Sequence, residues 1–284
     1  MSKNYRAELV GAFGNPIDEN PTGVMEEAAF AAKGLNFRYL TVKVEKDDLE
    51  AAMNGVKAFG MKGINLTIPH KVNVLKYLDE LSEAAKIIGA VNMVVNKGGK
   101  LWGENTDGKG FLISLKNEGV SVGGKQVVIL GAGGAAKAIG VECALAGAKK
   151  IIIVNRNQER GEDLVRLIEE KTSAAAEYAS WDSTYKVAAG TDIFINATCI
   201  GLYPDVNSKP DVDYDTVTSH MVVSDVVFND PNTLFLKEAA KRGAHTVNGL
   251  GMLVNQGALN FTLWTGAEAP IDVMTDTLKK EFSL

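Results

Sequence analysis

The stretch that decides the fold is LGAGGAAKA, residues 130–138, which follows the apolar segment KQVVILG at 125–131. It fits the pattern G-x-G-x-x-G/A at Gly131, Gly133 and Ala136, and alanines open the helix that comes next. In such a turn the first glycine permits a tight bend, the second lets a pyrophosphate approach the backbone, and the small third residue lets the helix pack on the strand. The helix N-terminus then offers free N–H groups to phosphates. This strand, turn and helix together predict a dinucleotide-binding site.

Strand-like and helix-like segments alternate along the whole chain. In the second half, apolar runs of strand length recur as KKIIIVNR (149–156), DIFINAT (192–198) and MVVSDVVF (221–228). Such runs are typical of strands buried on both faces of a parallel sheet. The other expected elements are strands at 6–13, 37–45 and 62–68, helices at 23–34 and 48–59, a hairpin near 90–104, and C-terminal helices near 250–263 and 267–281. The sequence therefore predicts an α/β fold with mainly parallel sheets.

A loop rich in glycine, asparagine and aspartate, WGENTDGKG at 102–110, separates the two halves and leads into a helix expected to begin near Gly110. We place the domain junction there. Residues 1–107 are predicted to form a smaller α/β substrate-binding domain that is completed by C-terminal helices within 252–284. Residues 108–251 are predicted to form the parallel-sheet nucleotide-binding domain.

Composition excludes several classes of protein. The chain has 284 residues, a formal net charge of -5 and no dense cluster of lysine and arginine, so nucleic acid is not an expected partner. No apolar run approaches the length of a membrane span, and the N-terminus lacks the layout of a signal peptide, which predicts a cytoplasmic protein. Cys143 and Cys199 are interpreted as buried free thiols. Three histidines without ligand spacing predict no metal site.

The end of the second nucleotide-domain strand predicts the choice of cofactor. An NAD-selective site commonly carries an acidic residue there, which accepts hydrogen bonds from the ribose hydroxyls. This chain instead has Asn155, Arg156 and Asn157, with Arg160 one turn later. A planar guanidinium suits bidentate phosphate binding, which favours NADP. NAD stays the alternative, because both arginines can be solvated side chains that Glu159 partly offsets.

Two polar residues in the first half are candidates for catalysis. The segment GINLTIPHK runs an apolar strand into a proline turn, with Asn65 and Thr67 on one face and Lys71 beyond its carboxyl end, where ligands bind in α/β sheets. Asp107 lies in the ENTDG loop. Lys71 alone could be a surface charge, and Asp107 alone a turn or capping residue. Together they fit alcohol oxidation, in which a lysine takes the hydroxyl proton while a carboxylate holds and polarises the lysine.

Eight segments occur in a family's order and spacing over nearly the whole chain. They are NLTIPHK (65–71), GAVNMVV (89–95), GENTDGKG (103–110), LGAGGAAKAI (130–139), NR (155–156), INAT (195–198), DVVFNDPNT (225–233) and NGLGMLVNQGA (248–258). As a set they resemble the shikimate dehydrogenase family, which includes quinate/shikimate dehydrogenases. The resemblance implies a Rossmann-like domain that binds NADP, or NAD, beside an N-terminal substrate domain.

The resemblance also implies roles for individual residues. Lys71 would be the acid/base residue and Asp107 its partner at the reacting hydroxyl. The residues implied to hold the substrate hydroxyls are Asn65, Thr67, Asn92 and Gln256. The residues implied to bind the cofactor are Gly131, Ala132, Gly133, Gly134, Ala135, Asn155, Arg156, Arg160, Thr198, Val226, Gly249 and Met252.

The segment GNPIDENPTGVMEE (14–27) departs from the family pattern. Where the family usually has two serines that bind the substrate carboxylate, this chain has Asn20 and Thr22. Glu19 and Glu26 stand where the family often has histidine, and they are expected to add negative charge. Asparagine and threonine can still donate hydrogen bonds to a carboxylate.

A second departure is Phe228, which replaces a tyrosine that usually helps to bind the same carboxylate. Losing a hydroxyl from a site built for hydrogen bonding can redirect specificity. The hypothesis from the resemblance is reversible, NADP-dependent reduction of 3-dehydroshikimate to shikimate, a step of aromatic amino acid biosynthesis. The alternative is a paralogue that oxidises quinate, an aminoshikimate or another cyclitol or polyol with NAD or NADP.

A third hypothesis is a nucleotide-sensing protein that has lost catalysis, against which the presence of both Lys71 and Asp107 argues. The expected partner is a small polyol or cyclitol. A homodimer is one oligomeric state that the sequence leaves open.

Overall fold

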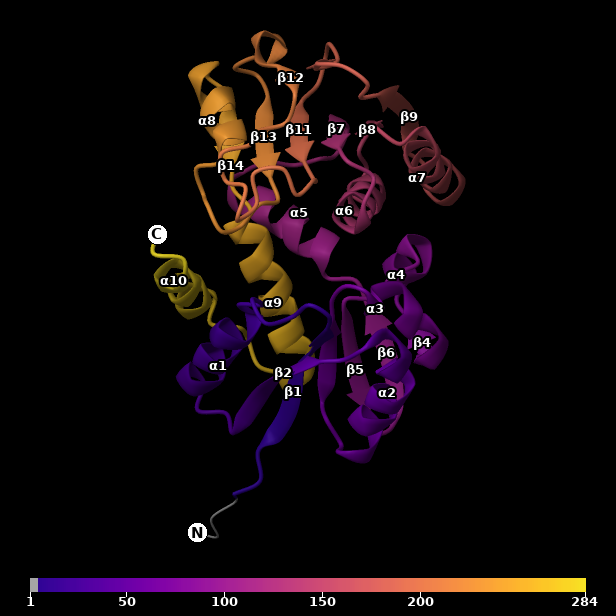
Figure 1. Cartoon of the computed structure of the whole chain (residues 1–284), viewed down its shortest axis with the longest axis vertical. Coiled ribbons are helices and arrows are strands. Elements are labelled where there is room, and N and C mark those ends of the chain that lie inside the picture. The colour runs from indigo at the N-terminus through magenta and orange to yellow at the C-terminus, as the bar shows by residue number, and fades with distance from the viewer. Residues whose placement is uncertain (1–4) are drawn as a thin grey trace. The chain divides into compact units, whose positions relative to one another are not determined.

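The computed structural model describes residues 5–284 and divides into two compact units. The first unit contains the chain up to Thr106 together with Gln256–Ser283, and the second contains Asp107–Asn255. Each unit has its own six-stranded sheet with helices packed on it (Figure 1). The α/β fold class predicted from the sequence is therefore confirmed.

The sheet of the first unit is mixed, with strand order β2-β1-β3-β5-β6-β4. β1 pairs in parallel with β2 and β3. β5 pairs antiparallel with both of its neighbours, β3 and β6. The hairpin expected near 90–104 is thus present, and it makes this sheet less parallel than expected. The strands are β1 (Glu8–Gly14), β2 (Phe37–Lys43), β3 (Gly63–Leu66), β4 (Glu80–Leu81), β5 (Met93–Lys97) and β6 (Lys100–Glu104).

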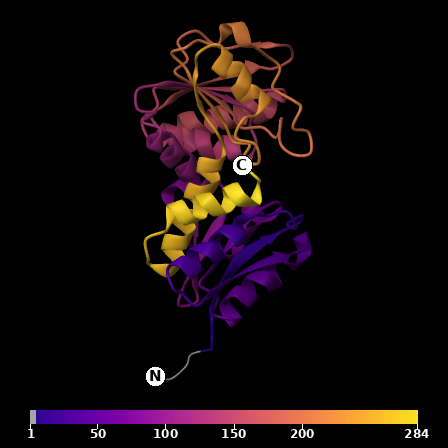
Figure 2. The same ribbon diagram turned by 90° about the vertical axis from the view of Figure 1, so that its left-hand side faces the viewer.

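Helices cover both faces of this sheet. On one face α2 packs into a core that includes Met53, Val56 and Ile64. On the other, Phe30 of α1 stacks on Phe37 at 5.1 Å and on Phe261 of α9 at 5.4 Å between ring centroids. Figure 2 shows yellow α10 beside indigo α1. The helices are α1 (Thr22–Ala32), α2 (Leu49–Ala58), α3 (His70–Asn73), α4 (Glu83–Ile88), α9 (Leu250–Thr265, which belongs to this unit from Gln256) and α10 (Ile271–Glu281), with 3-10 turns at Lys46–Asp48 and Val74–Tyr77.

The sheet of the second unit is parallel throughout, with strand order β14-β13-β11-β7-β8-β9. Numbered from the first strand of this unit, that is the order 6-5-4-1-2-3 of a Rossmann fold, with the switch point between β7 and β11. The strands are β7 (Gln126–Leu130), β8 (Lys150–Asn155), β9 (Ala175–Ser180), β11 (Ile193–Asn196), β13 (Val222–Asp225) and β14 (His245–Val247).

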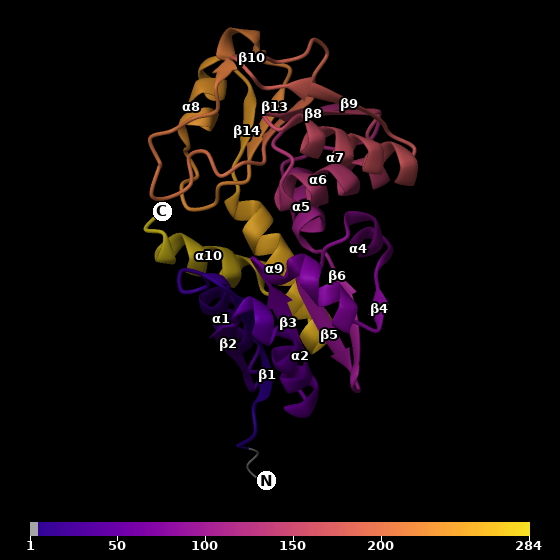
Figure 3. The ribbon, with the colours of Figure 1, turned by 45° about the vertical axis from the view of Figure 1, so that its right-hand side comes forward.

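The apolar strands of this unit are buried on both faces because successive side chains point to opposite sides. Val127 and Ile129 of β7 belong to the core under α5, α6 and α7. Val128 and Leu130 belong to the core on the other face, which includes Phe235 of α8. Figure 3 shows α6 and α7 side by side. The helices are α5 (Asp107–Asn117), α6 (Gly134–Leu145), α7 (Gln158–Lys171) and α8 (Leu234–Lys241).

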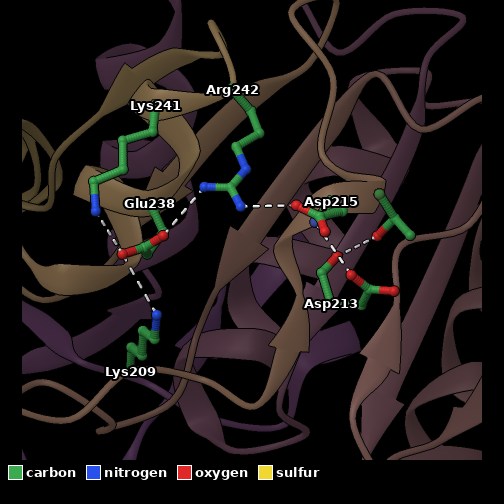
Figure 4. Close-up of polar contacts among 7 residues, drawn as sticks. Lys209, Asp213, Asp215, Glu238, Lys241 and Arg242 are labelled. Atoms are coloured by element: carbon green, nitrogen blue, oxygen red, sulfur yellow. Dashed lines mark hydrogen bonds and ion pairs between the residues drawn. The ribbon is translucent and has the colours of Figure 1, made fainter.

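Ion pairs fasten α8 to the segment that precedes β13 (Figure 4). Glu238 accepts from Lys241 at 2.9 Å and from Arg242 at 3.3 Å and lies 3.5 Å from Lys209. Arg242 also reaches Asp215 at 2.8 Å, in the 3-10 turn Tyr214–Thr216 that follows β12 (Val212–Asp213). Short β12 pairs with β10 (Tyr185–Lys186). Because these charges are partly exposed, we assign them a local role in positioning α8.

Three expectations need correction. Helix α5 begins at Asp107 and not near Gly110. Strands β9 and β14 were not expected, since each is an edge strand with a weak apolar pattern, and β14 has only three residues. Cys143 is buried as expected, but Cys199 is exposed because it follows the end of β11. Within residues 5–284, no helix is long and apolar enough to cross a membrane, and no group of metal-ligating side chains gathers.

Candidate active site

A buried polar cluster lies where β3 ends in the first unit. The Tyr39 phenol donates a hydrogen bond of 2.9 Å to Oδ1 of Asn65, and Nδ2 of Asn65 donates to the Asn92 carbonyl at 3.1 Å. Tyr39 and Asn65 are both only 8% exposed. Thr67, just beyond the strand, is half-buried and its carbonyl accepts from the His70 backbone at 2.8 Å. The alternation of Asn65 and Thr67 thus leads into a hydrogen-bonded site and not into an apolar core.

The cluster continues to helix α9 through side chains alone. Nδ2 of Asn92 donates to the Thr106 hydroxyl at 3.0 Å, and that hydroxyl donates to Oδ1 of Asn260 at 2.9 Å. Nδ2 of Asn260 in turn donates to Oε1 of Gln256 at 3.1 Å. All four side chains are buried. A connected buried network fixes the orientation of each amide, which is what recognition of several hydroxyl groups requires.

Lys71 is the second residue of the short helix α3 and is half-buried. The preceding residue, His70, is fully buried and its Nε2 lies 2.8 Å from the Val44 carbonyl. This bond ties the start of α3 to the segment after β2. The backbone that carries Lys71 is therefore anchored on both sides, since Val91 N also donates to the Lys71 carbonyl at 2.8 Å.

Asp107 is the first residue of α5 and is half-buried. A carboxylate in the first turn of a helix is stabilised by the positive end of the helix dipole. Gly108 must be glycine here, because a Cβ would lie 2.4 Å from the Ala138 carbonyl of α6. Close packing of α5 on α6 thus sets the position of Asp107.

Asn20 and Thr22, which stand where the family binds the substrate carboxylate, lie at the start of α1, a region that we call the carboxylate corner. Oδ1 of Asn20 accepts from the Thr22 backbone at 2.9 Å, and Thr22 is 7% exposed. Glu19 is exposed. Glu26 is completely buried, and burial raises the pKa of its carboxyl well above the ordinary value. The expectation that Glu26 adds negative charge is therefore corrected, because burial favours its uncharged form.

In the second unit the glycine-rich turn follows β7 at the switch point. Gly131 has a φ of 104°, and a Cβ there would lie 3.1 Å from the Ala197 carbonyl after β11. Gly133 and Gly134 are exposed, and a Cβ on either would meet no described atom within 4 Å. Ala132 and Ala135 are half-buried.

Helix α6 begins at Gly134, directly after the glycine-rich turn, without a side-chain cap. Its first N–H groups are open to an anion, so the turn fits a dinucleotide pyrophosphate.

Beside the turn, Asp225 organises the carboxyl ends of β11 and β13. Its carboxylate accepts from Asn196 Nδ2 at 3.0 Å, from the Thr233 hydroxyl at 2.7 Å and from the Val227 backbone at 3.1 Å. Thr198 follows, and its hydroxyl donates to Oδ1 of Asn196 at 2.6 Å. This network holds the two loops that contain Thr198 and Val226.

The segment before α9 packs tightly on the loop after β13. A Cβ on Gly249 would lie 2.4 Å from the Val227 carbonyl, so only glycine fits. Asn248 caps α9 by accepting from the Leu250 backbone at 3.1 Å. Met252 packs against the core of the second unit, and Phe228 is half-buried.

Two exposed arginines follow β8: Arg156 lies just after the strand and Arg160 lies in the first turn of α7. Arg156 and Arg160 have no hydrogen-bond or ion-pair partner for their guanidinium groups among residues 5–284. The turn between them is ordered: Nδ2 of Asn155 donates to the Asn157 carbonyl at 2.8 Å, and the Tyr178 phenol donates to the Asn155 carbonyl at 2.9 Å. Free guanidinium groups on a fixed turn fit a phosphate ester.

Several residues of these networks were missed from the sequence. Tyr39, Thr106 and Asn260 complete the polar cluster of the first unit, and Asp225 organises the second. Asn260 could have been found, because it lies four residues after Gln256 on the same helical face. Tyr39 had no such signal, since only the pairing of β2 with β1 brings it to the site.

The second unit is of the Rossmann type, which suits a nicotinamide dinucleotide, and the buried amides of the first unit suit hydroxyl groups. A chain with both units has the features of a nicotinamide-dependent oxidoreductase that acts on CH–OH groups. Family models match as the shikimate dehydrogenase substrate binding domain (residues 12–94), shikimate / quinate 5-dehydrogenase (114–203) and the shikimate 5'-dehydrogenase C-terminal domain (249–279). The chain belongs to the shikimate dehydrogenase family, as the sequence motifs predicted.

Known proteins resemble the chain over nearly its full length. The shikimate dehydrogenase (NADP(+)) of Desulforamulus reducens is 42% identical, with 98% of this chain and 97% of the relative covered. The ligand-free 5-ketofructose reductase of Gluconobacter sp. strain CHM43 is 48% identical, with a TM-score of 0.94 and coverage of 98% and 100%. Shikimate 5-dehydrogenase from Listeria monocytogenes, in complex with shikimate and NAD, is 37% identical, with a TM-score of 0.93 and coverage of 98% and 99%.

Proposed function

We propose that this protein catalyses reversible, NADP-dependent hydride transfer between a CH–OH group and the corresponding ketone of a polyhydroxylated substrate. The observation that carries the proposal is the buried network from Tyr39 through Asn65, Asn92 and Thr106 to Gln256, because such a row of fixed amides suits a ligand with several hydroxyl groups. The names of the curated relatives support NADP as the cofactor.

Within this proposal the two halves of the chain have separate tasks. Residues 1–107 with the C-terminal helices bind the substrate, and residues 108–251 bind the cofactor. Bound NADPH supplies the hydride. Lys71 donates a proton to the ketone oxygen during reduction and accepts it during oxidation, while Asp107 holds and orients the ammonium group.

The cofactor residues divide by the part of the nucleotide that they bind. The turn from Gly131 to Ala135 and the start of α6 bind the pyrophosphate. Asn155, Arg156 and Arg160 bind the adenosine ribose and its 2′-phosphate. Thr198, Val226, Gly249 and Met252 surround the nicotinamide.

Two substrates are candidates. The first is the pair 3-dehydroshikimate and shikimate, which the name of the D. reducens relative indicates. The second is a neutral polyhydroxy ketone of the 5-ketofructose type, which is favoured by the 48% identity to a 5-ketofructose reductase and by Asn20, Thr22 and Phe228 in place of the two serines and the tyrosine of the family pattern.

Steady-state assays of the purified protein test the proposal by following cofactor absorbance with NADPH and each ketone. Turnover of either ketone that is lost in Lys71→Ala supports hydride transfer. If the protein binds NADPH but reduces neither ketone, and oxidises neither shikimate nor quinate, the proposed function is wrong.

The localisation and the oligomeric state of the protein are predictions from its sequence. We expect a cytoplasmic enzyme, and a homodimer is the oligomeric state to test. Light scattering coupled to size-exclusion chromatography measures the mass of the particle directly, which is 30.3 kDa for one chain.

A further inference from the structure

We propose that Glu26 is a specificity-determining residue that binds a substrate hydroxyl and favours an uncharged polyhydroxy ketone over one that carries a carboxylate. This inference rests on the proposed hydride transfer and chooses between its two candidate substrates. It starts from the place of Glu26 on α1. Thr22 and Glu26 are four residues apart on that helix, so they lie on one face, and both are buried.

The Glu26 carboxyl is buried without any hydrogen-bond partner. Its exposed fraction is 0%, and neither Oε1 nor Oε2 accepts or donates a hydrogen bond within residues 5–284. Most buried polar side chains in native proteins are hydrogen-bonded, because an unpaired one loses its hydration without compensation. A carboxyl group in such a place gains from a hydrogen-bond partner outside the protein chain, and a ligand hydroxyl is such a partner.

Glu26 faces helix α9. A Cβ built on Gly257, the residue after Gln256, would lie 3.4 Å from Oε1 of Glu26 and would also meet the side chains of Met25 and Met274. Tyr39 is a titratable group nearby, and burial raises the pKa of its phenol.

Tyr39 packs against the same helix, since a Cβ on Gly23 would lie 3.0 Å from its ring, and its hydroxyl donates to Asn65. The carboxyl thus lies among α1, β2 and α9, close to Tyr39, whose hydroxyl contacts Asn65 of the polar cluster.

The charges around Glu26 determine which class of ligand can bind beside it. Within residues 5–284 no lysine or arginine forms an ion pair with Glu26, and burial favours its uncharged form. An uncharged carboxyl both donates and accepts a hydrogen bond, which suits a hydroxyl group. A substrate carboxylate in the same corner would find no cation and would oppose any ionisation of Glu26. The side chain of Glu26 has three rotatable bonds, so it can turn toward a bound hydroxyl without movement of α1.

Three variants test the role of Glu26. Glu26→Leu removes the hydrogen-bonding group while keeping an apolar side chain of similar size, and Glu26→Gln keeps a neutral donor and acceptor. Met25→Leu is the matched control, because Met25 is equally buried on the same turn and carries no hydrogen-bonding group. KM and kcat are measured with NADPH and either 5-ketofructose or 3-dehydroshikimate. Calorimetric titration of 5-ketofructose into the protein with NADP measures ligand affinity independently of turnover.

The expected result has four parts. The wild type has a higher kcat/KM for 5-ketofructose. Glu26→Leu raises the KM for that ketone about tenfold and weakens its calorimetric affinity equally, as loss of one hydrogen bond does. Glu26→Gln restores most of that loss. Met25→Leu keeps the wild-type KM. Because a merely structural carboxyl would change stability but not KM, this pattern identifies substrate recognition.

Two outcomes overturn the inference. Wild-type preference for 3-dehydroshikimate, with KM values unchanged in Glu26→Leu, refutes it while leaving the hydride-transfer proposal intact. Binding of 5-ketofructose that is equally strong in the wild type and in Glu26→Leu also refutes it. Conversely, calorimetric binding that depends on Glu26 without any turnover supports this inference and refutes the proposed function.

Discussion

The side-chain amide of Asn196 donates a hydrogen bond of 3.0 Å to Oδ1 of Asp225, which joins the carboxyl ends of the neighbouring parallel strands β11 and β13. The other oxygen of Asp225 accepts from the Thr233 hydroxyl at 2.7 Å, so the loop before α8 is attached as well. Asp225 is 1% exposed. One buried carboxyl therefore holds together the loops that contain the proposed nicotinamide residues.

The first prediction concerns the pH dependence of stability. Burial raises the pKa of Asp225 to about 6 from 3.8, although its hydrogen bonds act in the opposite direction. The folded state therefore holds the proton more tightly than the unfolded chain. The contribution of this carboxyl is complete below its unfolded pKa and is lost as pH rises through the folded pKa, a change of about 3 kcal/mol in the free energy of unfolding.

Urea unfolding measured in steps from pH 4 to pH 7 checks this expectation, with Asp225→Asn as the comparison. The asparagine of this variant keeps an oxygen that accepts from Asn196 and has an amide nitrogen that can donate to the Thr233 hydroxyl, but its side chain does not titrate. Subtracting its profile from that of the wild type isolates the contribution of Asp225. A difference profile that is flat over this range, or that rises with pH, would contradict the assignment.

The second prediction separates two glycines of the nucleotide turn. Gly131→Ala is expected to lower the free energy of unfolding by about 1–3 kcal/mol, because φ at this residue is 104° and the new Cβ would press on the Ala197 carbonyl. Gly134→Ala is expected to leave stability unchanged, because its Cβ meets no described atom and alanine suits a helix start. NADPH titrations are expected to show weaker binding for both variants. Equal stability of the two variants would argue against strain at Gly131.

The third prediction concerns proton transfer. Lys71→Ala is expected to lower kcat by about a hundredfold to ten-thousandfold, as loss of a general acid does, while the Kd for NADPH stays within a factor of two or so of the wild type. Stopped-flow measurement of hydride transfer together with fluorescence titration of NADPH gives both numbers. Asp107→Asn is expected to lower kcat less, because the lysine keeps its own proton. Full activity of Lys71→Ala would refute the role.

The parallel sheet could be predicted from the sequence because its central strands are buried on both faces. In the run KQVVILG, Val127 and Val128 lie in two different cores, so residues 127–130 are all apolar and the strand is readily recognised. The edge strands β9 and β14 gave no such signal, since a strand with one exposed side needs only a few apolar residues. The start of α5 at Asp107 was placed three residues too late, because glycines at 108 and 110 resemble a loop, whereas Gly108 allows close packing on α6.

The polar network could be predicted only in part. Asn65, Asn92 and Gln256 lie in recognisable sequence motifs. Tyr39 reaches the network only because β2 pairs with β1, and the burial of Glu26 is seen only in the folded chain. Neither event leaves a local pattern, because both depend on segments that are distant in sequence. The state of Glu26 was the most consequential error, since a glutamate near a helix start is ordinarily solvated and charged.

The last prediction concerns the choice between NADP and NAD. Arg156→Ala is expected to weaken NADP binding about tenfold to a hundredfold, as loss of a hydrogen bond to a charged group does, with little change for NAD, which lacks the 2′-phosphate. Tyr178→Phe is expected to have a smaller effect in the same direction, because it releases the Asn155 carbonyl and so loosens the turn that carries Arg156. Lys171→Ala, at the far end of α7, removes the same charge as a control. Equal weakening for both cofactors in Arg156→Ala would show that this arginine acts on the turn and not on the phosphate.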